Sequence, residues 1–249
     1  MLSGIDHLVI LVSDLETAIE DYRQQGFTVV RGGKHPTLTH NALIGLADGS
    51  YLELLAFYQS NPQSKWWSRL ALGGGLIAAC MQTDELNREI ATFRAAGIEM
   101  GDPMPLSRVR PDGYHLKWVL SVYGGESPEL VPFLIEDETP RAERVPRENS
   151  HRNQVTGIDT VTVAVRDLPV VKRWYTKAFG KAGETIERGN LNAAGVRFSV
   201  GAHKFDFLAP KSADGPLEDW LRARGPAPFS LSLTTSSGKT LEPVIAATH

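Results

Sequence analysis

The chain has one cysteine, Cys80, among its 249 residues, which excludes an intrachain disulfide. Cys80 lies in an apolar run, where a buried and unreactive thiol is the usual case. No apolar run approaches the roughly 18 residues that a membrane-spanning helix needs. Residues 1–4 carry no basic region, and Asp6 and His7 interrupt the apolar run that follows. We therefore expect no signal peptide, no membrane partner and a cytoplasmic location.

An excess of charge of one sign is also lacking, since 26 lysines and arginines face 29 aspartates and glutamates. The net charge of -3 gives no electrostatic reason to bind nucleic acid or an anionic membrane. The sequence has neither a glycine-rich phosphate loop nor a nucleophile elbow. The hydrophobic share of 42% is ordinary for a soluble protein with real cores. The expected partner is a small molecule.

A segment near the start returns later at a fixed distance. Residues 4–15 match residues 157–168 at an offset of 153, with His7 replaced by Thr160. Residues 51–56 match residues 204–209 at the same offset, and Trp67 and Arg69 match Trp220 and Arg222. Three matches at one offset predict a duplicated domain.

Each copy is predicted to consist of strand, helix and three strands, repeated. Ser13 and Glu16 fit a capping box that starts the first helix, and Thr83 can cap the second. The strands expected from hydrophobic pattern and turn residues are 5–12, 27–31, 41–46 and 50–57, then 76–81, 98–110, 115–123 and 130–135.

The second copy is shorter than the first. A third unit spans 157–210, and a fourth has only the helix at 217–224 and the strand at 229–234, after which 241–249 could form part of a helix and no strand. Residues 137–154 are charged and interrupted by prolines, which is typical of a linker. The fold prediction is an α+β chain with one domain at 1–136, a linker at 137–154 and an incomplete domain at 155–249.

Paired units of this kind, with a histidine on the first strand and a glutamate on the fourth, resemble the vicinal oxygen chelate superfamily and its glyoxalase-like branch. The residues that carry the resemblance are Ile5-Asp6-His7-Leu8-Val9, Gly26-Phe27, His35-Pro36, Tyr51-Leu52-Glu53-Leu54, Arg110-Pro111-Asp112-Gly113 with Trp118, and Pro132-Phe133. The resemblance implies a half-open barrel of eight strands around a divalent metal, held by ends of the first and fourth strands. Its members include isomerases, dioxygenases, epimerases, thiol transferases and metal-free binding proteins.

His7 and Glu53 are the first candidate ligands. A histidine in an apolar strand and a glutamate between two leucines are each costly to bury without a partner. Such ligands suit Zn, Mn, Fe or Ni. The alternatives are that the two side chains pair with each other, or that Glu53 faces solvent.

The second unit departs from the resemblance, because Ile77 and Pro132 stand near the positions where further ligands are implied. Glu136 and His115 are the substitutes, and Glu136 is taken as the third ligand and as a candidate proton carrier. With only two protein ligands, the site is either open and filled with water or free of metal.

Other polar and aromatic residues are candidates for substrate binding. The loop at 32–41 carries His35, His40 and Asn41, of which His40 is the candidate acid-base catalyst. Further candidates are Arg108 and Arg110, as a clamp for a carboxylate or phosphate, and Tyr51 and Trp118, as the lining of an apolar pocket.

Two functions remain open from these residues. The first is a metal-dependent enzyme of the glyoxalase-like class, of lyase, isomerase or dioxygenase type, that polarises a substrate oxygen. The second is a metal-free binding, resistance or sensor protein that uses the same concave surface. Because Thr160 replaces His7, the second copy is expected to be structural or an interaction surface.

The strand at 229–234 has an edge without successors in the chain. Its backbone groups and apolar side chains need cover from the tail, the first domain or a second molecule. A two-fold dimer is a common solution, so we expect a homodimer whose contact includes 217–234.

Overall fold

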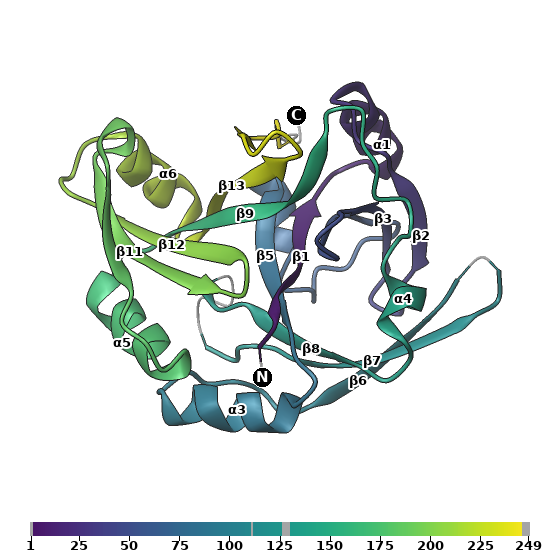
Figure 1. The fold of residues 1–249 in the computed structure, drawn as a ribbon, viewed down its shortest axis with the longest axis horizontal. Coiled ribbons are helices and arrows are strands. Elements are labelled where there is room, and N and C mark those ends of the chain that lie inside the picture. Colours follow the sequence, from purple (N-terminus) through teal and green to yellow (C-terminus); the bar gives the residue numbers. More distant parts are fainter. Residues whose placement is uncertain (1, 111, 126–129, 246–249) are drawn as a thin grey trace.

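The computed structural model describes residues 2–110, 112–125 and 130–245 and contains two curved sheets with helices on their outer sides (Figure 1). Pro111 of the motif and residues 246–249 of the expected C-terminal helix lie outside this description. The elements of the first half are β1 (Gly4–Leu11), α1 (Leu15–Gln24), β2 (Val30–Lys34), β3 (Thr39–Gly45), β4 (Tyr51–Phe57), α2 (Trp67–Ala71), β5 (Gly75–Gln82), α3 (Leu86–Ala95), β6 (Met104–Val109), β7 (His115–Ser121), β8 (Phe133–Asp137) and α4 (Arg141–Arg144).

The second half repeats this order as far as β13, which corresponds to β5 of the first half. Its elements are β9 (Val155–Ala164), α5 (Leu168–Ala178), β10 (Glu184–Arg188), a 3-10 turn (Gly189–Leu191), β11 (Ala193–Val200), β12 (His203–Pro210), α6 (Pro216–Arg224), β13 (Ala227–Thr235) and β14 (Thr240–Leu241). The predicted α+β class and the unit of strand, helix and three strands are confirmed.

The first sheet joins two units through their first strands. Its order is β2-β3-β4-β1-β5-β8-β7-β6, in which β1 pairs parallel with β4 and antiparallel with β5. The sheet curves until its outer strands β2 and β6 approach each other. A Cβ atom added at Gly33 would lie 3.5 Å from the Val109 carbonyl oxygen, an ordinary van der Waals distance, so the two outer strands are in contact here. The result is a nearly closed barrel.

The second sheet repeats the first half of this arrangement, with the order β10-β11-β12-β9-β13-β14. In the first sheet His7 is paired with Tyr51, and in the second Thr160 is paired with Lys204. Both pairs are related by the offset of 153 found in the sequence, so the repeat preserves strand register as well as pattern. This sheet remains open.

The end of the fourth unit differs from the prediction. A short strand, β14, follows β13 and pairs with it at Leu233 and Thr234. The expectation that no strand follows 229–234 was therefore wrong. A turn at Ser236–Gly238 lets the chain fold back, and the Gly238 amide donates to the Thr235 carbonyl oxygen at 2.8 Å.

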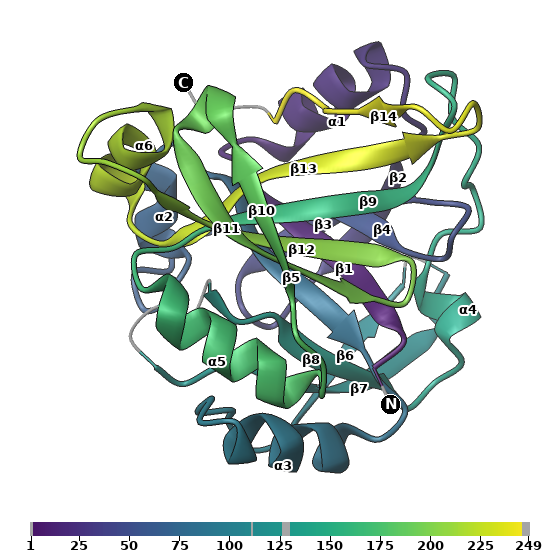
Figure 2. The ribbon, with the colours of Figure 1, turned by 60° about the vertical axis from the view of Figure 1, so that its left-hand side comes forward.

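The two sheets share one hydrophobic cluster. Leu8 and Met81 of the first sheet and Val161 and Leu231 of the second belong to it, and all four are at most 2% exposed. Figure 1 shows β1 and β5 beside β9 and β13, while α3 and α5 lie next to each other along one side, as Figure 2 also shows. The first sheet thus covers the apolar face of β13 within the same chain.

The segment 137–154 is anchored to the first sheet. Arg144 in α4 is 5% exposed and His151 is 8% exposed. His151 accepts a hydrogen bond at Nδ1 from the Thr28 amide (3.0 Å), and its Nε2 lies 2.8 Å from the Gly45 carbonyl oxygen. The segment that sequence pattern suggested as a plain linker thus holds buried polar groups.

Candidate active site

A cavity of about 350 Å³ lies inside the curve of the first sheet. Its wall is largely apolar, and a few polar side chains converge on it, as in sites that bind small molecules. The apolar lining includes Leu43, Leu55, Trp66, Met104, Leu106, Trp118, Leu120, Val122, Phe133 and Ile135, and the polar lining includes His7, His35, Thr39, Asn41, Tyr51, Glu53, Ser107, Arg108 and Arg144.

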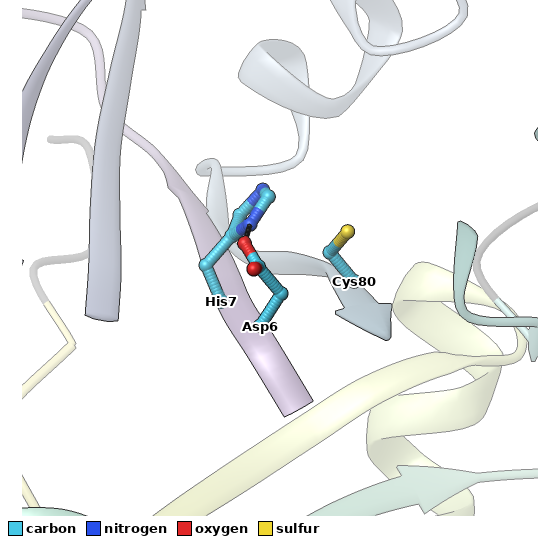
Figure 3. Close-up of side chains that lie close together, drawn as sticks. All are labelled: Asp6, His7 and Cys80. Carbon is cyan, nitrogen blue, oxygen red and sulfur yellow. Dashed lines mark hydrogen bonds and ion pairs between the residues drawn. The ribbon is translucent and has the colours of Figure 1, made fainter. Parts of the chain in front are cut away.

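A β-bulge in β1 sets the geometry of the first candidate ligand. Ile5 pairs with Met81 and His7 with Cys80, which leaves Asp6 as an extra residue on β1. The bulge lets adjacent side chains meet, and Asp6 Oδ1 lies 2.6 Å from His7 Nδ1 (Figure 3). The second copy has the same bulge at Asp159, which accepts a hydrogen bond from the Thr160 hydroxyl at 2.7 Å.

Two arginines from α4 neutralise Asp6. Arg144 donates to both carboxylate oxygens at 2.9 Å, and Arg141 donates to Oδ2 at 2.5 Å. Burial alone would raise the pKa of Asp6, but the charge and hydrogen bonds of Arg144, together with His7, hold that pKa well below its usual range. Asp6 therefore acts as an acceptor, so His7 donates from Nδ1 and directs Nε2 away from Asp6.

His7 Nε2 faces Glu53, whose Oε2 lies 3.5 Å away. Asn41 Nδ2 donates to the other oxygen, Oε1, at 2.6 Å, and Asn41 Oδ1 accepts from the Gly33 amide at 3.0 Å. Tyr51 stacks on the His7 ring with centroids 4.6 Å apart. Asp6 and Tyr51 thus fix the imidazole of His7, and Asn41 fixes the carboxylate of Glu53. Both His7 and Glu53 line the cavity.

The His7 and Glu53 atoms fit a divalent ion. A tetrahedral ion bound about 2.1 Å from each atom would separate them by about 3.4 Å, close to the observed 3.5 Å. Asp6, His7 and Cys80 also lie close together, with potential ligand atoms within 4.8 Å. That group suits a metal poorly, because the arginines occupy both Asp6 oxygens and burial raises the pKa of the Cys80 thiol.

The other predicted ligand, Glu136, lies outside the cavity. Ile135 lines the cavity, and strand alternation turns the next side chain to the opposite face. Glu136 Oε2 accepts a hydrogen bond from the Leu86 amide at 2.8 Å, where α3 begins. The structure thus corrects the sequence prediction, since Glu136 caps a helix and cannot reach His7 or Glu53.

His40 lies away from the cavity for the same reason. Thr39 and Asn41 line the cavity, whereas His40 lies against Tyr58, with ring centroids 6.0 Å apart. The loop histidine that does line the cavity is His35, whose Nδ1 lies 2.9 Å from the Thr39 hydroxyl. Burial lowers the pKa of His35 more than the nearby Glu53 raises it.

Only one of the two arginines predicted to bind substrate lines the cavity. Arg110 forms ion pairs with Asp112 (2.6 Å) and Glu143 (2.8 Å) and does not line the cavity. Arg108 lines the cavity and is 6% exposed. His115, the alternative ligand, is exposed at the start of β7, outside the lining. Of the predicted substrate-binding residues, His35, Asn41, Tyr51, Arg108 and Trp118 come together, and Arg110 does not.

Comparison with known proteins decides the family. The model of the glyoxalase-like domain matches residues 5–179, more than half of the chain. The chain belongs to the glyoxalase-like domain family. No protein with a curated description matches it. Within the residues described above, no helix has both the length and the apolar character to cross a membrane.

Solved structures share the glyoxalase-like fold at low sequence identity. A hypothetical protein from Staphylococcus aureus superposes with a TM-score of 0.65 and 16% identity, over 85% of this chain and 87% of that one. A mutant of 4-hydroxymandelate synthase from Streptomyces coelicolor gives 0.64 and 15%, over 94% and 72%. A fusion of a xylose isomerase-like TIM barrel and 4-hydroxyphenylpyruvate dioxygenase gives 0.55 and 14%, over 94% of this chain and 36% of the fusion.

The second sheet lacks the candidate ligand pair of the first sheet. Thr160 stands in the place of His7, and Asp206 in the place of Glu53. Asp206 is fully buried and accepts hydrogen bonds from Arg188 and from Arg197, each with one contact at 2.6 Å. Arginines of the second sheet therefore bind the carboxylate of Asp206, whereas Glu53 in the first sheet accepts a hydrogen bond from the uncharged Asn41.

Sequence pattern missed three residues of the site. Asp6 belongs to the motif at residues 5–9, and an acidic residue beside a histidine in an apolar strand is its only signal in the sequence. Arg144 lay in the segment assigned as linker, with no local sign of its long-range partners. Trp66 has no feature in the sequence that distinguishes it from a residue that packs between units, yet it lines the cavity.

Proposed function

We propose that this glyoxalase-like protein is a small-molecule enzyme whose first barrel binds a divalent metal through His7 and Glu53. The observation that carries the proposal is the 3.5 Å separation of His7 Nε2 and Glu53 Oε2. Two acceptor atoms so close favour a cation between them. A divalent ion bound there would polarise a carbonyl or hydroxyl oxygen of the substrate.

The chain's own residues would hold and shield the substrate. Trp66, Trp118 and Phe133 provide an apolar wall that excludes water from the reacting group. His35 is the residue we assign to proton transfer, because burial lowers its pKa and keeps the ring neutral and able to accept a proton near pH 7. Its Nδ1 contact with the Thr39 hydroxyl fixes the orientation of the ring.

The alternative is a metal-free binding protein that uses the same cavity. The observation in its favour is that β8, where the family resemblance implies a further ligand, lines the cavity with the apolar Phe133 and Ile135. In that case His7 and Glu53 would form an ion pair with each other. The fold it shares with enzymes does not decide between these functions.

Metal content separates the two functions. The purified protein should contain close to one equivalent of a transition metal by mass spectrometry, and His7→Ala and Glu53→Gln should each remove it. His115→Ala is the matched control, because this histidine is exposed and lies outside the cavity lining. Binding of less than a tenth of an equivalent, unchanged by mutation and by added metal salts, would leave the binding protein as the function.

A further inference from the structure

Within residues 2–110, 112–125 and 130–245, Arg108 is a buried cation whose guanidinium has no hydrogen-bond acceptor. It lies on β6, is 6% exposed and lines the cavity. In the part of the chain that the structure describes, its guanidinium makes no hydrogen bond or ion pair, whereas the nearby Arg144 binds Asp6, Tyr51 and Asp137. A guanidinium keeps its charge and five N–H donors, so burying it without an acceptor is costly.

The acids around the cavity are already engaged elsewhere. Asp6 is bound by two arginines, and Asn41 holds one oxygen of Glu53 while the other faces His7. A Cβ at Gly33 would lie 3.3 Å from Arg108 Nη1, so the absence of side chains on this stretch of β2 leaves space for the guanidinium. The charge of Glu53 acts on Arg108 without a hydrogen bond, so the N–H donors of Arg108 are left for an acceptor that enters the cavity.

We propose that Arg108 binds the carboxylate of a substrate whose remaining body is apolar or aromatic. A planar guanidinium matches a carboxylate with two parallel hydrogen bonds, and a single cation balances a monoanion better than a phosphate dianion. The apolar body would lie against Trp66 and Trp118. This inference names the substrate class of the proposed function and rests on it only in taking the cavity as the binding site.

A matched pair of probes tests the proposal on metal-free protein. Calorimetry should show that 2-naphthoate binds roughly tenfold or more tightly than the neutral 2-naphthamide, because only the acid forms charge-assisted bonds with Arg108. Arg108→Met should abolish the preference. Lys65→Met is the control, because it removes a cation from the exposed mouth of the same cavity and should retain the preference.

Several outcomes would overturn the assignment. These are equal binding of the acid and the amide, binding of neither, loss of the preference in Lys65→Met, or tighter binding of 2-naphthyl phosphate than of 2-naphthoate. If Arg108→Met does not fold, as judged by circular dichroism, Arg108→Lys keeps the charge without the planar fork and should reduce the preference several-fold. Because EDTA-treated protein is used, failure of the metal site and failure of this inference are distinguishable.

Discussion

Arg144 and Asp6 form a bidentate ion pair, in which Nη1 and Nη2 of the arginine each lie 2.9 Å from a carboxylate oxygen. Arg144 is 5% exposed and Asp6 fully buried, although 138 residues separate them in the sequence. Asp6 in turn contacts His7 Nδ1. The segment that follows the first barrel thus orients the first candidate metal ligand.

Removal of Arg144 should destabilise the protein strongly. Arg144→Gln leaves Asp6 and Asp137 without this partner in a buried site, and breaking a buried ion pair costs about 3–5 kcal/mol of unfolding free energy. Arg147→Gln is the control, because that side chain is 79% exposed and its pair with Glu143 should contribute less than about 1 kcal/mol. Urea denaturation measures both. Equal losses for the two variants would contradict the prediction.

Asp6 should act on metal affinity through His7. Asp6→Asn replaces the acceptor that fixes the His7 tautomer, and loss of such a partner typically costs about 10- to 100-fold in metal affinity. Competition with a chelator measures the change in folded protein. Asp159→Asn alters the equivalent bulge in the second copy and should leave metal affinity unchanged. An unchanged affinity in Asp6→Asn would show that Asp6 has no role in positioning His7.

Glu136 should affect stability and not metal binding. Its carboxylate accepts from the Leu86 amide, so Glu136→Ala removes a helix cap that is worth about 0.5–2 kcal/mol of unfolding free energy. Thermal unfolding and metal analysis of the same sample distinguish a cap from a ligand. Loss of metal with unchanged stability would restore Glu136 as a ligand.

Acid should weaken the attachment of the segment 137–154 through His151. Burial lowers the pKa of His151 below its ordinary value of about 6.5 more than its bond to Gly45 raises it, and Nδ1 must stay unprotonated to accept from the Thr28 amide. When the pH falls below the ordinary histidine pKa, the unfolded chain binds more protons than the folded chain. The unfolding free energy should therefore decrease as pH falls. Urea denaturation at pH 5.5 and 7.5 should show a smaller difference for His151→Gln than for the natural protein. The exposed His115→Gln should keep the full difference.

The homodimer stays a prediction. The first sheet covers the apolar face of β13, and β14 covers its edge at Leu233 and Thr234, so the part of the edge before Leu233 is what a second molecule could still pair with. Light scattering after size exclusion should give about twice 27.3 kDa, and Phe229→Asp should shift the protein toward monomer. A soluble monomer at micromolar concentration would show that the cover within the chain is sufficient.

The sequence by itself predicted the repeated unit of the fold and the two candidate ligands, His7 and Glu53. The offset of 153 located the duplicated copy, and the register of His7 with Tyr51 and of Thr160 with Lys204 follows the same offset. His7 and Glu53 could be picked out because a polar residue in an apolar strand is a local signal of a costly burial. Such signals need only neighbouring residues and strand alternation.

Only the tertiary structure decided which polar residues share the cavity. Alternation along β3 and β8 sends His40 and Glu136 to the face opposite Asn41 and Ile135, and a shift of one residue in the expected register reverses such an assignment. Arg144 and Arg108 show the same limit more sharply. Neither sequence neighbourhood indicates a distant partner, yet Arg144 pairs with Asp6 and Asp137, whereas Arg108 has no ion pair among the described residues. Tertiary packing alone determines which distant charges come together.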